Sequence, residues 1–526
     1  MKLLHDLIFD SADARPDHIA LYGGHERVTY AALAAAARGV ANGLRALGVE
    51  RRDRIAIFLP KSIETVAAMF GASAAGAVFV PVNPVLKAPQ VVHILRDSGA
   101  RVLITSAGRA ATLSAELAQC PELRALVLTD VGPHAPIAGL PAVAWGDFVT
   151  ARPAAHARGI DFDMAAILYT SGSTGRPKGV VLSQRNMVCG AQSVSQYLGN
   201  TPADRILAVL PFSFDYGFSQ LSTAFLTGAG VALIEYLLPR DVVAALERYE
   251  ITGLAAVPPL WIQLAALAWP GAIATRLRYI TNSGGAMPTA TLAKLREKLP
   301  STSVFLMYGL TEAFRSTYLP PDQVDVRPTS MGQAIPNAEI LVVRPDGTPC
   351  GPGEPGELVH RGALVSLGYW NDPEKTAERF RPSPAQPGEL TIPELAVWSG
   401  DTVMRDDEGY LYFIGRRDEM IKTSGYRVSP TEVEEVVYAT GLVAEAVVVG
   451  APHPVLGAAI VVIAVAQSGT NAGPEALTAA CRKALPSYMV PARIEWRDVL
   501  PRNANGKIDR PALAAAVAGL FENAGE

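Results

Sequence analysis

Short apolar runs that alternate with helix-like stretches are the feature that most constrains the fold up to about residue 330. Many of these runs are apolar at nearly every position, and they lie at residues 54–59, 78–82, 101–105, 165–170, 205–212, 231–236, 254–258, 279–284 and 304–309. Such continuous apolarity is typical of strands that are buried on both faces of a parallel sheet. Helix-like stretches at 30–48, 62–76 and 89–99 lie between some of the runs. The alternation predicts an α/β fold of parallel or mixed sheets flanked by helices.

The pattern changes after about residue 330. Residues 338–362 carry Pro and Gly turns between short strands, and residues 400–418 form a hairpin pattern, which together predict a β-subdomain. The tail predicts a small α+β unit, with a helix, two strands and a helix at 430–440, 444–451, 458–466 and 473–486. We therefore predict a large N-terminal domain, residues 1–417, and a small C-terminal domain, residues 418–526.

Composition excludes several classes of protein. The formal net charge of −4 over 526 residues argues against a nucleic-acid binder, for which a basic surplus is expected. The four cysteines are far apart and match no metal-ligand spacing. The N-terminus lacks the apolar core of a signal peptide, and the longest apolar run, 67–82, is shorter than the about 20 residues that cross a bilayer. We expect a cytoplasmic protein without an integral membrane segment and without a nucleic-acid partner.

Residues 169–181, YTSGSTGRPKGVV, form a phosphate-binding pattern directly after an apolar strand. Backbone N–H groups and hydroxyls of Ser, Thr and Gly can surround phosphate oxygens, and Lys178 adds a positive charge. The pattern is not a P-loop, which requires G-x-x-x-x-G-K-[ST]. Counted from Gly172, the second glycine position is Pro177, and Lys178 is followed by Gly179. The loop is expected to hold phosphate for a different reaction.

Three further segments carry polar residues that suit a nucleotide. LMYGLTEA, residues 306–313, offers Tyr308 to stack on a purine and Glu312 to bind Mg²⁺. Residues 398–428 offer Asp401 for ribose hydroxyls and Arg416 for a phosphate, and PRNANGKIDR, residues 501–510, presents Lys507 near the end of the chain. Residues of these types are also common in solvated loops, so each segment alone is a weak signal.

Taken together and in this order, the four segments resemble the adenylate-forming superfamily of acyl-CoA synthetases, adenylation domains and beetle luciferases. The resemblance rests on YTSGSTGRPKG, YGLTEA, SGD, GYLYFIGRRDEMIKTSGYRVSPTEVE and NGK, and covers essentially the whole chain. It implies a reaction in which a carboxylic acid and ATP form an acyl-adenylate and pyrophosphate, after which a thiol displaces AMP. The cofactors implied are ATP, Mg²⁺ and coenzyme A, or the phosphopantetheine arm of a carrier protein.

The resemblance also implies roles for single residues. Catalysis would depend on Lys507, Glu312 and Lys178, with Glu312 as the Mg²⁺ ligand and Lys507 bridging the substrate carboxylate and the α-phosphate. The residues expected to bind ATP are Thr170, Ser171, Gly172, Ser173, Thr174, Gly175, Lys178, Gly285, Ala286, Tyr308, Gly309, Thr311, Asp401, Arg416 and Lys507.

In the family, the C-terminal domain rotates between the two half-reactions. Asp418 matches the hinge position, and Lys422, Gly425 and Tyr426 would line the tunnel for the thiol after the rotation.

The acyl pocket of the family corresponds to Phe214, Asp215, Ser283, Gly284 and Gly309. Asp215 matches the position at which members that activate amino acids bind the substrate ammonium. A buried carboxylate favours a cationic partner, but Asp215 could equally be satisfied by local backbone donors. The motif SGYRVSPTEVE resembles the acyl-CoA ligases more than the peptide-synthetase modules.

The nearest resemblance is to the acyl-CoA ligase group associated with exosortase-type protein-sorting systems, beside which a carrier protein is often encoded. Two hypotheses stay open: an acyl-CoA synthetase, and an amino-acid or acyl:carrier-protein ligase. A binding protein without activity and a P-loop NTPase are disfavoured, because Lys507, Glu312 and Lys178 are all present and the P-loop spacing fails.

Overall fold

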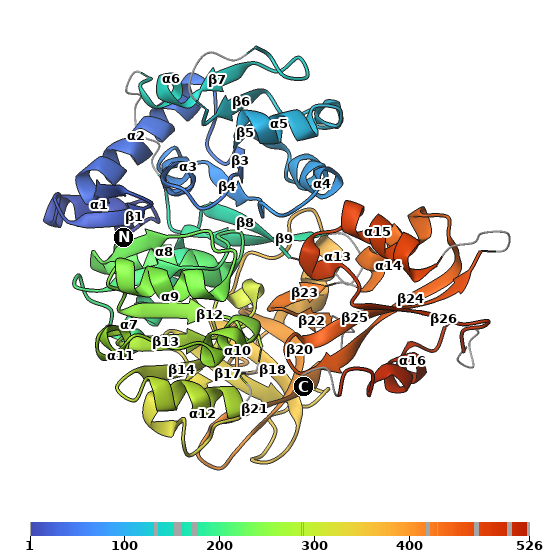
Figure 1. Cartoon of the computed structure of the whole chain (residues 1–526). Helices are drawn as coiled ribbons and strands as arrows, with labels where there is room; N and C mark the ends of the chain where they lie inside the picture. The colour runs from blue at the N-terminus through green and yellow to red at the C-terminus, as the bar shows by residue number, and fades with distance from the viewer. Residues whose placement is uncertain are drawn as a thin grey trace.

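The structure is a computed structural model that describes residues 2–130, 135–151, 159–170, 177–285, 287, 289–416, 421–428, 430–467, 473–501 and 508–522. Within these ranges the strands form four sheets. Two large sheets and one of the smaller sheets build the N-terminal part, and the fourth lies beside them in the C-terminal part (Figure 1). Helices of the described ranges are all too short or too polar to cross a membrane.

Both large sheets are mixed, with mostly parallel strands. The seven-stranded sheet runs in the order β7 (Ala142–Ala144), β6 (Ala125–Leu128), β5 (Ala100–Thr105), β3 (Arg54–Phe58), β4 (Val78–Pro81), β8 (Met164–Thr170) and β9 (Lys178–Ser183). The nine-stranded sheet runs β16 (Gln333–Ala334), β15 (Thr317–Leu319), β14 (Ser303–Tyr308), β13 (Tyr279–Asn282), β12 (Gly253–Ala256), β10 (Arg205–Ala208), β11 (Gly230–Leu233), β1 (Ile19–Gly23) and β2 (Glu26–Thr29). The predicted fold class is confirmed.

The helices of the N-terminal part cover both faces of these sheets, except that α13 packs on the smaller sheet. Their bounds are α1 (Asp6–Ala14), α2 (Tyr30–Ala46), α3 (Ile63–Ala74), α4 (Ala88–Ser98), α5 (Ala107–Leu113), α6 (Trp145–Val149), α7 (Gln184–Leu198), α8 (Asp215–Thr227), α9 (Pro239–Arg248), α10 (Pro258–Ala266), α11 (Gly271–Arg276), α12 (Thr289–Lys298) and α13 (Pro373–Arg379).

Strand β3 shows why the sequence pattern was continuous rather than alternating. Ile55 and Ile57 point into the largest core, which lies between the two large sheets. Ala56 and Phe58 point to the other face, into the core that α4 and α5 cover. Successive side chains of a strand face opposite sides, so a strand buried on both faces needs apolar residues throughout.

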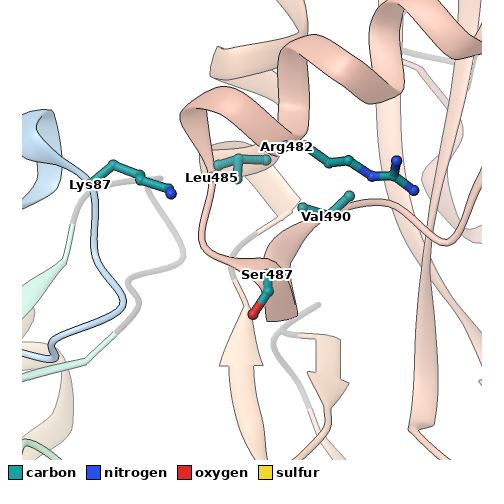
Figure 2. A pocket seen from close by; sticks show the side chains of 5 residues that line it. All are labelled: Lys87, Arg482, Leu485, Ser487 and Val490. Carbon is teal, nitrogen blue, oxygen red and sulfur yellow. The ribbon is translucent and has the colours of Figure 1, made fainter. Parts of the chain in front are cut away.

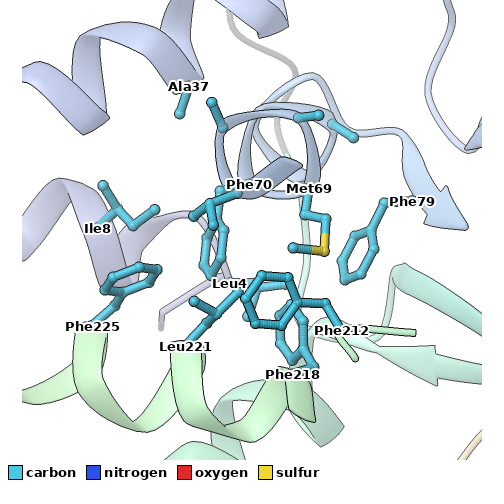
Figure 3. Packing of buried hydrophobic residues seen from close by; sticks show 14 of the residues in the cluster. Leu4, Ile8, Ala37, Met69, Phe70, Phe79, Phe212, Phe218, Leu221 and Phe225 are labelled. Atoms are coloured by element: carbon cyan, nitrogen blue, oxygen red, sulfur yellow. The ribbon is translucent and has the colours of Figure 1, made fainter. Parts of the chain in front are cut away.

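The core between the large sheets holds helix α8 in place (Figure 3). Phe218, Leu221 and Phe225 of α8 pack against Leu4, which precedes α1, and against Phe70 and other residues of α1, α2 and α3. The Phe218 ring stacks on the Phe70 and Phe79 rings, at centroid distances of 5.9 and 5.4 Å. Because α8 begins at Asp215, this packing fixes the position of a residue that was predicted to lie in the acyl pocket.

Several predicted strands end early, and the one at 205–212 falls furthest short. The run at 205–212 forms a strand only as far as Ala208. The chain then turns into α8, with Phe214 as the residue before its first turn. The apolar residues beyond Ala208 are buried, although they are not in a strand. Burial alone therefore produced the apolar pattern there.

The β-subdomain is a five-stranded sheet built from β17 (Ala338–Val343), β18 (Gly356–Gly362), β20 (Leu395–Arg405), β19 (Phe380–Pro382) and β21 (Leu411–Arg416). The C-terminal sheet contains β23 (Tyr426–Val428), β22 (Ile421–Thr423), β25 (Gly457–Ala466), β24 (Val443–His453) and β26 (Arg493–Trp496). Its helices are α14 (Pro430–Ala439), α15 (Pro474–Ala484) and α16 (Arg510–Val517). The predicted domain boundary and hinge, at residue 418, lie outside the described residues and stay predictions.

We expect Phe218→Ala to destabilise the fold strongly. The side chain is fully buried between two rings, and loss of a buried Phe side chain typically costs about 3–5 kcal/mol. Urea unfolding followed by circular dichroism measures the loss. Val326→Ala is the control, because that side chain is 67% exposed and its loss should stay within about 0.5 kcal/mol. Equal effects of the two variants would contradict this account of the core.

Candidate active site

Four neighbouring parallel strands of the nine-stranded sheet bring the predicted residues together. β10, β12, β13 and β14 run side by side in the same direction. Their carboxyl ends therefore meet at one edge, which is where ligands bind in open α/β sheets. Asp215 follows β10, Val257 follows β12, Ser283–Gly285 follow β13, and Gly309–Glu312 follow β14.

Among the described residues, only one of the two carboxylate oxygens of Glu312 has a hydrogen-bond partner. The Tyr369 hydroxyl donates a hydrogen bond to Glu312 Oε1 at 2.6 Å. Glu312 Oε2 is buried, and the described residues offer it no hydrogen-bond partner. Buried polar atoms are rarely left unpaired, and Mg²⁺ is commonly held by one carboxylate together with substrate phosphates. The unpaired Oε2 therefore suits the predicted role of Glu312 as a metal ligand.

Lys178 lies over the ring of the same tyrosine, Tyr369. It begins β9, opposite Thr170 at the end of β8. Its Nζ lies 5.6 Å from the ring centroid of Tyr369. Burial and the neighbouring charge of Lys375 lower the pKa of Lys178. The loop residues Ser171–Gly175 lie outside the described residues, so their predicted contacts with phosphate stay predictions.

The residues predicted to bind the nucleoside also lie together. Tyr308 donates a hydrogen bond from its hydroxyl to Asp401 Oδ2 at 2.5 Å. Arg416 is directly opposite Asp401 in the pairing of β20 with β21, although only its backbone is described. Thr311, which is also predicted as an ATP contact, donates from its hydroxyl to Asp215 Oδ1 at 3.2 Å. Thr311 thereby links the nucleotide segment to the acyl pocket.

Two glycines near these residues allow close packing. A Cβ on Gly309 would lie 3.2 Å from Arg315 Cα, and a Cβ on Gly285 would lie 3.2 Å from Pro258 Cγ. The carbonyl of Gly285 accepts a hydrogen bond from Asn282 Nδ2 at 2.9 Å. Ala286 lies outside the described residues.

Two buried residues of opposite charge, Asp215 and Arg315, lie at the acyl pocket without a direct salt bridge between them among the described residues. Asp215 is 4% exposed and Arg315 is 1% exposed. Burial raises the pKa of Asp215 to about 6, although the charge of Arg315 and the hydrogen bond from Thr311 act in the opposite direction. Arg315 Nη1 donates to Ser283 Oγ at 3.0 Å, and the guanidinium lies over the Tyr216 ring, 4.6 Å from its centroid. Arg315 Nε and Nη2 are buried without a hydrogen-bond partner among the described residues.

A strained turn directs Arg315 into the pocket. Phe314 has φ 56° and ψ −57°, a conformation that a bulky residue rarely adopts. The N–H of Arg315 donates to the carbonyl of Ala313 at 2.6 Å and closes a γ-turn. The Phe314 ring is fully buried against Gly190, where any side chain would collide with it. The sequence analysis did not identify Arg315 as a site residue. The feature that could have indicated it is a single charged residue within the otherwise uncharged segment AFRSTYL.

Gly284 and Gly425 bring the acyl pocket and the predicted thiol tunnel into contact. A Cβ on Gly284, which has φ +80°, would lie 3.6 Å from the Gly425 carbonyl oxygen and 3.9 Å from Phe214 Cζ. A Cβ on Gly425 would lie 2.8 Å from Val257 Cβ. The backbone of the C-terminal part therefore approaches the edge of the nine-stranded sheet as closely as only glycine permits.

The other predicted tunnel residues lie near this contact in sequence. The Tyr426 ring stacks on the Tyr488 ring, with 3.7 Å between the ring centroids. Burial raises the pKa of Tyr426 to about 12. Lys422 Nζ lies 4.5 Å from the ring centroid of Phe413. Asp418 and Lys507, the predicted hinge and catalytic lysine, lie outside the described residues.

A pocket on the seam between the two parts of the chain lies apart from these residues (Figure 2). Lys87 reaches towards it from the N-terminal part, and Arg482, Leu485, Ser487 and Val490 line it from the C-terminal part. Gln90 closes the seam nearby, since its Nε2 donates to Glu432 Oε1 at 3.1 Å.

Comparison with known proteins identifies the family profile that the chain matches. Residues 8–370 match the profile described as AMP-binding enzyme, and residues 432–507 match the AMP-binding enzyme C-terminal domain.

The chain is also similar to curated proteins of several activities. It is 32% identical to tyrocidine synthase 3 of Brevibacillus parabrevis over 97% of its own length, but spans only 8% of that protein. It is 30% identical to feruloyl-CoA synthase of an Amycolatopsis species, covering 94% of each chain. It is 32% identical to the L-proline--[L-prolyl-carrier protein] ligase of Pseudomonas fluorescens, covering 99% of this chain and 100% of that protein.

Two solved structures of o-succinylbenzoate CoA synthetase (MenE) from Bacillus subtilis resemble the fold to different degrees. The double mutant bound with its product analogue OSB-NCoA gives a TM-score of 0.83, at 28% identity over 97% of this chain and 98% of that one. The complex with the acyl-adenylate intermediate gives 0.68, at 29% identity over 96% and 97% of the two chains.

We expect Asp215 to make stability depend on pH. Its folded pKa of about 6 lies above its ordinary value of 3.8, so the folded state holds the proton more tightly than the unfolded state. The stability that follows is fully present below about pH 4 and is lost as the pH rises through about 6. Relative to Asp215→Asn, the native chain should lose up to about 3 kcal/mol between about pH 4 and 7. Urea unfolding across this range measures the difference, and parallel profiles would contradict it.

Proposed function

We propose that the chain, which belongs to the AMP-binding enzyme family, is an acid–thiol ligase of the adenylate-forming superfamily that forms an acyl-adenylate and transfers the acyl group to coenzyme A. The strongest support is the contact between Gly425 and Gly284. It brings the segment predicted to guide the thiol against the segment predicted to hold the acyl group. Such a contact suits the second half-reaction, in which sulfur must reach the acyl carbon.

The two MenE complexes support the same arrangement. Both are structures of the same enzyme, one of them a double mutant, at nearly equal sequence identity to this chain. The chain is more similar to the complex with the CoA product analogue than to the complex with the acyl-adenylate.

In the first half-reaction, two anions must approach each other, so catalysis is mainly electrostatic. A carboxylate oxygen of the acid attacks the α-phosphorus of ATP, and pyrophosphate leaves. Lys178 and the preceding loop would hold the departing phosphates, and Lys507 would neutralise charge between the carboxylate and the α-phosphate. A Mg²⁺ ion bound through Glu312 Oε2 would supply further positive charge to the phosphate oxygens.

The residues around the nucleoside and the acyl group would fix the adenylate. Tyr308 and Asp401, joined by their hydrogen bond, would hold the adenosine, with the Asp401 carboxylate accepting from the ribose hydroxyls. In the second half-reaction the thiol sulfur attacks the acyl carbon, its proton is released, and AMP leaves with the bonding electrons.

Coenzyme A is the preferred thiol because of the charge at the seam. Lys87 and Arg482 place two cations around the pocket of Figure 2. Coenzyme A carries several phosphate charges along its length, whereas a carrier protein offers one phosphate on its arm. The four cysteines are free and buried, which suits a reducing compartment, and we place the reaction in the cytoplasm.

A second candidate is an amino acid:carrier-protein ligase, and Asp215 is the observation that favours it. Asp215 is buried, and among the described residues its carboxylate accepts a side-chain hydrogen bond from Thr311 but forms no direct salt bridge, so a substrate ammonium could compensate its charge. The similarity to the L-proline carrier-protein ligase supports this reading. Arg315 opposes it, because its positive charge already favours the ionised form of Asp215.

ATP–pyrophosphate exchange with a panel of fatty, aryl and amino acids tests the function. We expect exchange with fatty or aryl acids, followed by thioester formation when coenzyme A is added. Exchange with amino acids alone, lost in Asp215→Ala, would replace this proposal by the second candidate. Absence of exchange with every acid, in a folded protein, would count against both. Thioester formation with a phosphopantetheinylated carrier protein but not with coenzyme A would change the thiol partner.

We expect Lys507→Ala to separate the half-reactions. Loss of one preorganised charge contact typically lowers the rate by about 10²–10³. Acyl-adenylate formation should fall by at least this factor, while thioester formation from preformed adenylate should be largely retained. Single-turnover measurements of each half-reaction make the comparison. Equal losses in both would show that Lys507 does not have this role.

A further inference from the structure

Tyr369 touches two groups of the proposed site, although nothing in the sequence pattern pointed to it. Its hydroxyl donates to Glu312 Oε1 at 2.6 Å, and its ring faces Lys178 Nζ at 5.6 Å. Among the described residues, this hydroxyl is the one donor that the Glu312 carboxylate has. Its loss would leave the Glu312 carboxylate, whose Oε2 is buried, without a hydrogen-bond donor among the described residues.

The backbone around Tyr369 is fixed from several sides. Trp370 N donates to the Gly179 carbonyl at 2.7 Å, and Val181 N donates to the Gly368 carbonyl at 2.9 Å, which ties the segment to β9. Ser366 N donates to the Glu312 carbonyl at 2.9 Å, which ties it to the segment after β14. The segment 366–370 therefore bridges the strand that begins at Lys178 and the turn that carries Glu312.

A further backbone bond and a ring contact also hold Tyr369. Its backbone N–H donates to Thr376 Oγ1 at 3.0 Å. The Tyr369 ring meets the Phe380 ring edge to face, at a centroid distance of 5.7 Å. A residue that is fixed in this way can orient a weakly held partner, whereas a mobile one cannot.

We propose that Tyr369 is a positioning residue that holds Glu312 Oε1 so that Oε2 stays directed to a divalent cation, and that its ring sets Lys178 beside the same phosphates. The inference rests on the proposed function, in which Glu312 binds Mg²⁺. Partners that orient a metal ligand typically change metal affinity by 10–100-fold when they are removed. One side chain would then fix the spacing between the metal ligand and the phosphate-binding cation.

Direct Mn²⁺ binding, measured by electron paramagnetic resonance with α,β-methylene-ATP, tests the role of the hydroxyl. Tyr369→Phe keeps the ring and removes the hydroxyl, so we expect Mn²⁺ to bind about 10–100-fold more weakly. Nucleotide binding measured in EDTA should not change, because Lys178 keeps its ring contact. Tyr369→Leu removes the ring as well and should weaken metal-free nucleotide binding too.

Two comparisons separate positioning from general damage. Tyr412→Phe removes another tyrosine hydroxyl that bonds a carboxylate, Asp406 Oδ2 at 3.1 Å, in the β20–β21 hairpin, and should bind Mn²⁺ as the native protein does. In a Glu312→Gln background, Tyr369→Phe should have no further effect, since it acts through Glu312. Unfolding midpoints establish that each variant is folded.

The possible outcomes distinguish this role from the proposed function. If Tyr369→Phe is folded and binds Mn²⁺ within about twofold of the native protein, the positioning role is wrong while the proposed function stands. An additional loss in the Glu312→Gln background would likewise overturn the role. If the native protein itself shows no Mn²⁺ binding with the nucleotide, both the metal site and the role of Tyr369 fail.

Discussion

The packing of two large sheets around one shared apolar core is the constraint on which the rest of the structure depends. Strands such as β3 are buried on both faces, so the sheets cannot slide or turn without exposing apolar surface. Helix α8 is clamped in this core through Phe218 and Phe225. Because α8 begins at Asp215, the rigid core determines where the most unusual carboxylate of the site lies.

The candidate site, which lies at the edge of the nine-stranded sheet, contains charged groups that are buried. Asp215, Arg315 and one oxygen of Glu312 are removed from water, and the described residues leave several of their polar atoms unpaired. Isolated buried charge is costly, so such groups usually serve binding or catalysis. The strained turn at Phe314 belongs to the same pattern, since strain of this kind persists only where the surrounding structure enforces it.

The sequence predicted the fold class and most strands, because burial on both faces leaves a direct record in composition. It also placed Tyr308, Glu312 and Asp401 in one nucleotide site, where the structure brings Tyr308 and Asp401 into contact. It extended the strand at 205–212 too far, since burial without strand geometry gives the same pattern. It did not predict the hydrogen bond from the Thr311 hydroxyl to Asp215, and the ATP contact of Thr311 stays a prediction. The family subgroup, the domain boundary and the role of Lys507 stay predictions.

By itself, the sequence determined which chemical groups are present and which strands they follow, because apolar periodicity and local motifs are properties of neighbouring residues. Only the tertiary structure decided which groups meet. Tyr369 reaches Glu312 across 57 positions of the chain, and Gly425 reaches Gly284 across a still longer distance in sequence. These contacts depend on the order of strands in the sheets and on where the C-terminal part packs against the N-terminal part. Strand order follows from packing among distant residues, which leaves no local pattern in the sequence.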